Sequence, residues 1–427
     1  MEGGELYMTN LTRKVVTGLT TGALVASLFT QVAFADTTLT ISGNGSSSAN
    51  NVNVASSNQT TVTQSNSLNV TNNVTSNAQT GGNHASSNTG GNNSISTGDA
   101  NTTTNVSTTG NLNQADTSGC GCNNGSTTVS VDGNGDSSTN KVDLGQNNTT
   151  LTAQNNNANV TNNVDSNSQT GGNHESSNTG GNNTISTGDA TSTTNVSTTA
   201  NANLVSVGGG NGSNGGSSLS LDITGNGENS WNKIDATSGN STAVEQSNGA
   251  WIDNEVASNA QTGGNHASSD TNGDVTISTG DAAANTTVNN EANFNSADVA
   301  DCGCAQNATG SVSGNGEKSW NALSADLGNT LYVDQGGEGF GNKADLNNDA
   351  AANAQTGGNH SSSDTGNSNS DGVDVSTGGA SNGTTVNNTG NVNVYGPGPI
   401  VLPTGTQVNF TWGWLSSWFG GMFSSNS

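Results

Sequence analysis

QTGGNH, residues Gln79–His84, is the stretch that decides the fold, because it occurs four times in the 427-residue chain. The copies begin at residues 79, 169, 261 and 355, so successive starts lie 90, 92 and 94 residues apart, and each copy ends on one of the chain's 4 histidines. A period this long indicates an array of stacked units rather than one globular core. The Gln, Gly and Asn positions form the predicted repeat core: Gln79, Gly81, Asn83, Gln169, Gly171, Asn173, Gln261, Gly263, Asn265, Gln355, Gly357 and Asn359.

Two further motifs keep the same register. A GNG turn opens each unit, and STGDA follows the hexapeptide in three units and becomes STGGA at Ser376 in the fourth. The predicted organisation is an export signal at 1–35, repeat units at 36–125, 126–218, 219–307 and 308–395, a Pro/Gly spacer at 396–407 and an aromatic tail at 408–427.

Composition limits the size of the apolar interior and the kinds of molecule that the chain can bind. Only 28% of the residues are hydrophobic and 9% charged, while 60 are glycine, too few apolar atoms to fill a large enzyme domain. A thin solenoid or a disordered polar chain fits this composition. The formal net charge of -26 repels nucleic acid, which is therefore excluded as a partner.

Apolar residues of the first unit alternate with polar ones, as in Leu39 and Ile41 or Leu68 and Val70, which is the strand period. Glycine turns punctuate the pairs, and the 3 prolines all follow the repeats. Two packed sheets need more aliphatic side chains, so the pattern predicts an all-β solenoid whose Asn, Gln and Thr side chains form ladders between coils about 4.8 Å apart. With coils of roughly twenty residues, each unit would rise about 20 Å and the four units about 80 Å.

The opening turns repeat a Ser and an Asn two positions apart. The pairs are Ser48 and Asn50, Ser138 and Asn140, Ser230 and Asn232, and Ser319 and Asn321. This spacing predicts a turn whose polar groups are satisfied by side chains.

The N-terminus has the features of an export signal. Arg13 and Lys14 precede an apolar run that closes on Ala33-Phe34-Ala35, which predicts cleavage after Ala35. A retained membrane anchor is the less favoured alternative, because polar residues interrupt the run. The expected location is extracellular or at the cell surface.

Cysteine occurs only in two CxC pairs, Cys120 with Cys122 and Cys302 with Cys304, and an even count in an exported chain favours disulfides. In an 80 Å rod these pairs would lie on the order of 40 Å apart, beyond disulfide reach. A local staple, cross-linking to another molecule and, least favoured, metal binding remain open.

The tail carries aromatic residues at steps of four, among them Trp414 and Trp418, which indicates a short amphipathic helix. It could cap the last coil or dock to a membrane surface or a partner.

Four histidines spaced about 20 Å apart could not share one metal ion, and solvent-facing positions beside turns are expected. Asp99, Asp189 and Asp281 suggest calcium, but the fourth unit has Gly379 there, so only weak Ca²⁺ binding and no resident cofactor are expected. No unit offers a Ser-His-Asp set or a phosphate loop, and enzymatic activity is not expected.

The Gln-x-Gly-Gly-Asn core, with Gln79, Gly81 and Asn83 and their equivalents, resembles the strand-loop-strand units of curlin-type proteins, bacterial secreted β-repeat proteins that assemble into adhesive amyloid fibres. The resemblance implies a surface fibre or adhesive role, with self-association or a cell-surface or matrix polymer as partner.

The function expected from the sequence is therefore architectural: an exported structural or adhesive protein, with possible assembly into fibres. The alternative is a carbohydrate- or calcium-binding module that uses Trp231, Trp251 and Trp320 with neighbouring acids. A third hypothesis, ice binding, would use the threonine rows at 102–104 and 108–109.

Overall fold

The computed structural model describes residues 14–17, 25–28, 37–117, 126–176, 178–207, 218–268, 271, 273–299, 307–336, 341–362 and 373–396, and every named element in them is a strand. Residues 1–35, the predicted export signal, contribute two short strands, β1 (Lys14–Thr17) and β2 (Val25–Leu28). Both CxC pairs and the aromatic tail, with Trp414 and Trp418, lie outside the described residues. Among the described residues, no helix is long and apolar enough to cross a membrane.

Each repeat unit forms one layer. Layer 1 contains β3 (Thr37–Ser42), β4 (Ala49–Gly81), β5 (His84–Ser86), β6 (Asn93–Thr97) and β7 (Ala100–Thr117). Layer 2 contains β8 (Thr127–Asp132), β9 (Thr139–Gly171), β10 (His174–Ser176), β11 (Asn183–Thr187) and β12 (Ala190–Val207). Layer 3 contains β13 (Ser218–Thr224), β14 (Trp231–Gln261), β15 (His266–Ser268), β16 (Val275–Ser278) and β17 (Ala282–Val299). Layer 4 contains β18 (Asn307–Ser313), β19 (Trp320–Gln335), β20 (Lys343–Gln355), β21 (His360–Ser362), β22 (Val373–Ser376) and β23 (Ala380–Tyr395).

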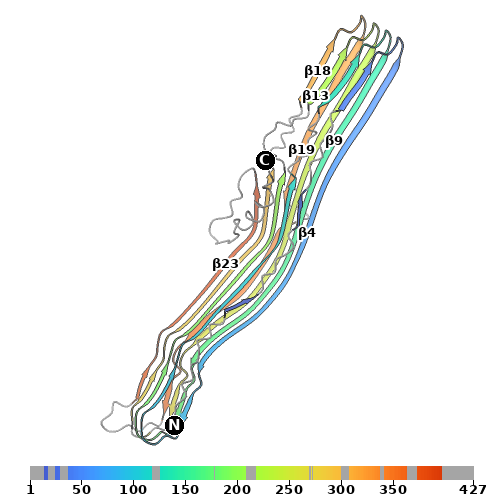
Figure 1. Cartoon of the computed structure of the whole chain (residues 1–427). Coiled ribbons are helices and arrows are strands. Elements are labelled where there is room, and N and C mark those ends of the chain that lie inside the picture. The colour runs from blue at the N-terminus through green and yellow to red at the C-terminus, as the bar shows by residue number, and fades with distance from the viewer. Residues whose placement is uncertain are drawn as a thin grey trace, which may run out of the picture. The chain divides into compact units, whose positions relative to one another are not determined.

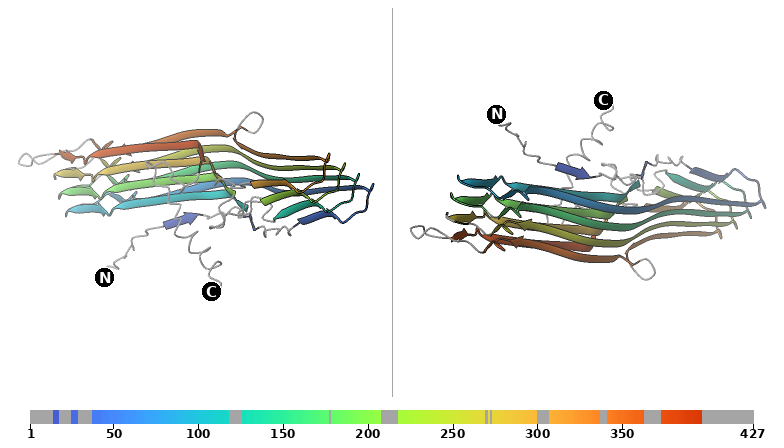
Figure 2. Two further views of the ribbon diagram at one scale, coloured as in Figure 1. Left: turned by 90° about the horizontal axis from the view of Figure 1, so that it is seen from above. Right: turned by 90° about the horizontal axis from the view of Figure 1, so that it is seen from below.

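Corresponding strands of neighbouring layers pair in parallel and in register. The long strands follow the order β19-β14-β9-β4, with β20 also on β14, and the returning strands follow β7-β12-β17-β23. Figure 1 shows the layers running side by side, with the GNG turns at one end and the QTGGNH turns at the other. Figure 2 shows the same layers stacked in sequence order. The predicted all-β repetitive solenoid is confirmed.

The predicted coil size is wrong. One coil is a whole repeat unit, because β4 runs 33 residues, about 110 Å, before the chain turns back. The strand was not recognised as continuous because some of its inward-facing residues are polar. Asn72, for example, is as buried as Val70 and Val74, so the alternation of inward and outward side chains continues although the hydrophobic pattern is interrupted there. Neighbouring units are therefore one strand spacing apart, about 4.8 Å, and not about 20 Å.

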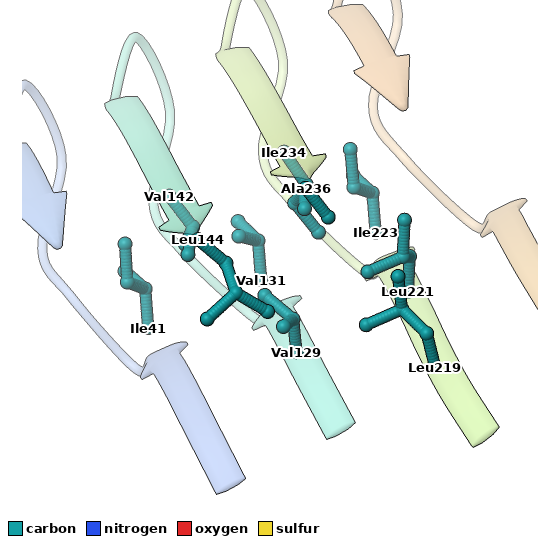
Figure 3. Close-up of a cluster of buried hydrophobic side chains, with 10 residues drawn as sticks. All are labelled: Ile41, Val129, Val131, Val142, Leu144, Leu219, Leu221, Ile223, Ile234 and Ala236. Atoms are coloured by element: carbon teal, nitrogen blue, oxygen red, sulfur yellow. The ribbon is translucent and has the colours of Figure 1, made fainter. Parts of the chain in front are cut away.

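Six small clusters of aliphatic side chains join the outgoing and returning faces of the coil. The cluster nearest the GNG turns combines β3, β8 and β13 with β9 and β14 (Figure 3). Its buried members are Ile41, Val129, Val131, Val142, Leu144, Leu219, Leu221, Ile223, Ile234 and Ala236. The interior thus contains a series of short apolar patches along the strands. In each layer a patch consists of only a few aliphatic side chains from the two facing strands.

Amide ladders fill the interior between these patches, as the sequence predicts. Asn72, Asn162, Asn254 and Asn348 form one column, in which each Nδ2 donates to the Oδ1 of the next layer at 2.6–2.7 Å. A glutamine column, Gln64, Gln154, Gln246 and Gln335, is linked at 2.7–2.9 Å. Because each side chain both donates and accepts, buried amides are satisfied without water.

Amides also bridge the two faces of one coil. Asn66 Nδ2 donates to Asn113 Oδ1 at 2.7 Å, and the equivalent pairs in the other layers span 2.7–2.8 Å. Beside this bridge Asn111 has a φ of 61°, and its Nδ2 donates to the carbonyl of Asn157 at 2.6 Å. Asparagine tolerates this left-handed conformation, so the same residue type bends the strand and ties it across the interior.

The predicted Ser-Asn turn is confirmed. Asn50 Nδ2 donates to Ser48 Oγ at 3.2 Å, and the three equivalent pairs do so at 3.1 Å. The same asparagines also form a ladder from layer to layer at 2.7–2.8 Å. Each GNG turn is therefore fixed both within its own layer and to its neighbours.

The expected separation of the CxC pairs depended on the assumed coil size. Thr117 and Val299 border the segments that contain these pairs, and they occupy the same position in layers 1 and 3. Two strand spacings, about 10 Å, therefore separate these two residues in place of the expected 40 Å.

The threonine rows assigned to ice binding are partly buried. Thr102, Thr104 and Thr108 face inward, because every second side chain of β7 does so. Those rows do not form a surface.

The buried ladder makes a direct stability prediction. Replacing Asn162 with Ala removes an inner member of the Asn72 column. One N–H of Asn72, whose Nδ2 still donates to Thr108 Oγ1 at 3.0 Å, and the Oδ1 of Asn254 then lose their partners. The free energy of unfolding should fall by about 1–3 kcal/mol, the cost of orphaned buried polar groups. Asn163→Ala, at the adjacent exposed position, should change it by less than about 0.5 kcal/mol. Chemical unfolding followed by circular dichroism measures both, and equal losses would show that the ladder contributes nothing specific.

The QTGGNH turn as candidate functional site

The hexapeptide is the turn at which each coil reverses. Its first glycine has a φ between 93° and 115° in the four copies, and a Cβ on Gly171 would lie 2.1 Å from the carbonyl oxygen of Gly263. No side chain fits where successive backbones approach this closely. The predicted core glycines Gly81, Gly171 and Gly263 thus allow the turns to stack, and Gly357 keeps the same positive φ in the last layer.

The predicted core asparagines form another ladder. Asn83 Nδ2 donates to Asn173 Oδ1 at 3.1 Å, Asn173 donates to Asn265 at 3.0 Å, and Asn265 donates to Asn359 at 3.0 Å. Each Oδ1 also accepts the backbone N–H of the preceding layer's asparagine at 3.1–3.2 Å. These residues therefore satisfy the turn backbone as well as one another.

The core glutamines differ from the glycines and asparagines. Gln79, Gln169, Gln261 and Gln355 are in register at the ends of the long strands. Their side chains face outward: Gln79 and Gln355 are exposed, and Gln169 and Gln261 are half-buried. The glutamines are thus the part of the repeat core that is available for contacts with another molecule.

Thr80 is a structural residue that the sequence reasoning missed. Its hydroxyl donates to the carbonyl of Gly98 in the STGDA motif at 2.7 Å, and the other three layers repeat this bond at 2.8–3.0 Å. The bond ties the outgoing strand to the returning one. The signal was the spacing from QTGG to STGD, which is 17 residues from Gln to Ser in the first three units and 21 in the fourth, where the motif is STGG.

The four histidines form a column, which corrects the expected 20 Å separation. Ring centroids lie 4.8 Å apart between His84 and His174, 4.7 Å between His174 and His266, and 5.0 Å between His266 and His360. The first two pairs are nearly parallel and the third is tilted by 34°. The end members are exposed and the inner two half-buried, so the solvent-facing expectation holds only at the ends.

His174 favours the neutral form. The Nδ1 atoms of His174 and His266 are buried without a hydrogen-bond partner among the described residues. Burial lowers the pKa of His174 below its ordinary value, and the neighbouring His266 and His84 lower this pKa further, because protonation would bring like charges together. The column is a π-stacked element when neutral and a repulsive one when charged.

The STGDA aspartates act as turn residues. Asp99 Oδ1 accepts the backbone N–H of Asp189 at 2.9 Å, Asp189 Oδ1 that of Asp281 at 2.8 Å, and Asp281 Oδ1 that of Gly379 at 2.7 Å. The fourth unit can therefore use glycine, because only the N–H of its residue is needed. Within the described ranges, no group of three or more His, Cys, Asp or Glu residues is placed to hold a metal ion.

The structure divides the predicted tryptophan set. Trp231 and Trp320 stack with ring centroids 4.9 Å apart and an interplanar angle of 7°. Trp251 lies 20 residues further along β14, about 65 Å of strand away, so the three rings do not form one site. In the pairing register Trp251 stands between Asn159 and Asp345.

No protein-family model, curated protein or solved structure matches the chain. The functional argument therefore depends on the geometry of the repeat itself.

The histidine column predicts a pH-dependent stability. The pKa of His174 is lower in the folded chain than in the unfolded chain, so the unfolded chain binds more protons between these two values. The contribution of His174 to the free energy of unfolding is complete above the ordinary histidine pKa of about 6.5. This contribution is lost as the pH falls below that value toward the lower pKa of His174 in the folded chain. The unfolding free energy should therefore be lower at pH 5.5 than at pH 8. His174→Asn, which does not titrate, should reduce this difference in denaturant melts, and an unchanged difference would exclude a contribution from His174.

Proposed function

We propose that the chain is an exported structural protein of the cell surface or extracellular matrix, which acts as a stiff β-solenoid and associates with itself or with a surface polymer. The observation that carries the proposal is the unbroken register of the first three layers over strands of 31–33 residues, which the fourth layer continues as two strands, β19 and β20. Columns of amides, stacked rings and backbone bonds all run in the same direction through the layers. Such an arrangement supports a mechanical role better than a chemical one.

The outer face supports the same role. Asn77, Asn167, Asn259 and Asn353 form an outward column with amide contacts of 2.8–3.0 Å, and Asn105 with Asn195 forms another at 2.9 Å. These rows present evenly spaced polar groups along the stack. An evenly spaced polar surface suits adhesion to a polymer or to further copies of the chain.

The export signal predicted from Arg13 to Ala35 supports an extracellular location. The negative charge of the chain is also consistent with a soluble precursor that stays dispersed before assembly.

The first test is assembly by the purified chain lacking the predicted signal, residues 36–427. In the presence of a reductant, which excludes cross-linking through the cysteines, the chain should form fibres that bind an amyloid dye and give a 4.8 Å cross-β reflection. Denatured chain held in urea is the control and should give neither signal. A folded chain that stays monomeric at high concentration, with no binding to surface polymers, would contradict the structural role.

A second candidate function is carbohydrate binding, because two tryptophans are exposed on the outer face. Trp251 is 53% and Trp320 is 47% exposed, and Asp345 is next to Trp251 in the pairing register. A flat exposed indole beside a carboxylate can stack on a sugar ring and accept a hydroxyl hydrogen bond.

On a glycan array, Trp251→Ala should abolish binding if this second candidate is correct. Trp320→Ala, which changes an equally exposed ring about 65 Å along the strand direction, is the matched control and should keep most of the signal. Absence of binding by the unchanged chain would remove the candidate.

A further inference from the structure

We infer that the fourth layer binds the first layer of a second copy of the chain, in register, so that the solenoid continues head to tail from one molecule to the next. This inference rests on the proposed structural function and names the partner and the surface. It concerns the free edge formed by β18, β19, β20, β22 and β23.

The fourth layer is open where the other layers are closed. Three inward-facing valines of this layer, Val312, Val375 and Val386, are 40–49% exposed. The residues at the same positions in the first three layers are at most 7% exposed. They are Ile41, Val131 and Ile223 for Val312, Ile95, Ile185 and Ile277 for Val375, and Val106, Val196 and Val288 for Val386. The valines of the fourth layer thus lack the covering that a further layer would supply.

An unused hydrogen-bond donor points to the same partner. Asn359 is the last member of the QTGGNH asparagine ladder, and its Nδ2 is buried with no hydrogen-bond partner among the residues that the structure describes. In every preceding layer this atom donates to the Oδ1 of the next asparagine. In a head-to-tail stack the next asparagine would be Asn83 of the second copy.

The segment 397–427 is too short to pair with the whole of this edge. Strands β19, β20 and β23 alone have 16, 13 and 16 residues, which together exceed the segment 397–427. The first layer of a second copy has strands in matching order, β3 to β7, in which β4 spans the positions of both β19 and β20, and three interfaces of this kind already exist within the chain. The head-to-tail contact would be the fourth of the same type.

Charge favours this polarity over contact between two fourth layers. The first layer, residues 37–117, carries only two carboxylates, Asp99 and Asp116, and no lysine or arginine. The fourth layer, residues 307–395, carries nine carboxylates and two lysines. Two fourth layers would repel each other, whereas a first layer adds little negative charge to the contact. Interfaces of this unsymmetrical kind generate open filaments when the rotation between successive copies does not close a ring.

The first-layer edge of the full chain is partly occupied. β1 pairs with Thr103–Val106 and β2 with Asn113–Asp116, on the edge of β7 that the second copy would use. Head-to-tail contact along β7 therefore requires the departure of residues 14–28, which the predicted cleavage after Ala35 provides. All six clusters and the ladders described above lie within residues 37–395, so residues 36–427 keep the elements that hold the fold together.

The test compares two variants of residues 36–427 that add the same charge to β23. Val386→Lys places an ammonium on the inward column, where it can reach water at the open end of a monomer but would be buried against Val106 of the second copy. Thr385→Lys places it on the adjacent outward position, which stays in water in both states. Circular dichroism should show that both monomers are folded.

Val386→Lys should slow seeded fibre growth by at least about tenfold, because a buried unpaired charge costs more than the 1.4 kcal/mol that a factor of ten represents. Its first layer is unchanged, so it should still add to the fourth-layer end of a growing fibre and then stop growth. Small amounts mixed with unmodified chain should therefore shorten the fibres, and Thr385→Lys should not. The fibres should also show an axial repeat of about 19 Å, four strand spacings.

The outcomes separate this inference from the proposed function. Fibres that grow equally well with Val386→Lys, or that lack the axial repeat of four layers, would overturn head-to-tail stacking and leave the structural role intact. Absence of fibres from the unmodified chain would overturn the inference, and if surface-polymer binding is also absent, the proposed function fails with it.

Discussion

The hydrogen bond between identical amide side chains in successive layers is the interaction on which this structure depends. A domain of this size normally excludes water with aliphatic side chains, but here the apolar patches are short and separated. Between them, buried Asn and Gln residues bond to their own counterparts one layer away, as in the column of Asn72, Asn162 and Asn254. An isolated buried amide is destabilising, whereas a column of them is satisfied at every internal member. The sequence repeat is therefore needed to satisfy the buried amides, because each of them bonds to the same residue type at the same position of the next layer.

This constraint also fixes the register. A slip of one residue between layers would oppose an inward amide with an outward side chain and break several ladders at once. The glycine turns add a steric condition, because Gly171 leaves no room for a Cβ against Gly263. Ladders determine which residues align and the turns determine where the strands reverse. Together they explain how a strand of 33 residues, far longer than a typical strand of about 5–6, keeps one alignment along its length.

The sequence was sufficient for the fold class, the ladders and the Ser-Asn turns, because each of these follows from local spacing that recurs in every unit. It was insufficient for the size of the coil. Hydrophobic alternation is visible at Leu68 and Val70 but disappears where Asn72 faces inward, so a continuous strand resembled several short ones. The wrong coil size then placed the histidines about 20 Å apart, although their rings stack at 4.7–5.0 Å. The Thr80 bond to Gly98 joins two motifs that are adjacent only once the coil closes, and pairing across a coil cannot be read from composition or period.

A stack of identical columns has no intrinsic end, since the last layer offers the same groups that the layer before it used. Differences between the layers must therefore define the ends of the molecule. Acidic residues are more numerous in the third and fourth layers than in the first two. Trp231 and Trp320 occur only in the last two layers, at positions that are Thr139 in layer 2 and Ala49 in layer 1. Among the described residues most of these changes lie on outward positions, and the exception is Glu175, which is buried in register with Ala85 and Ala267. The inward residues consequently preserve the ability of the layers to stack, and the outward residues distinguish one layer from another. A single chain can therefore repeat the same packing in every layer and still have two different ends.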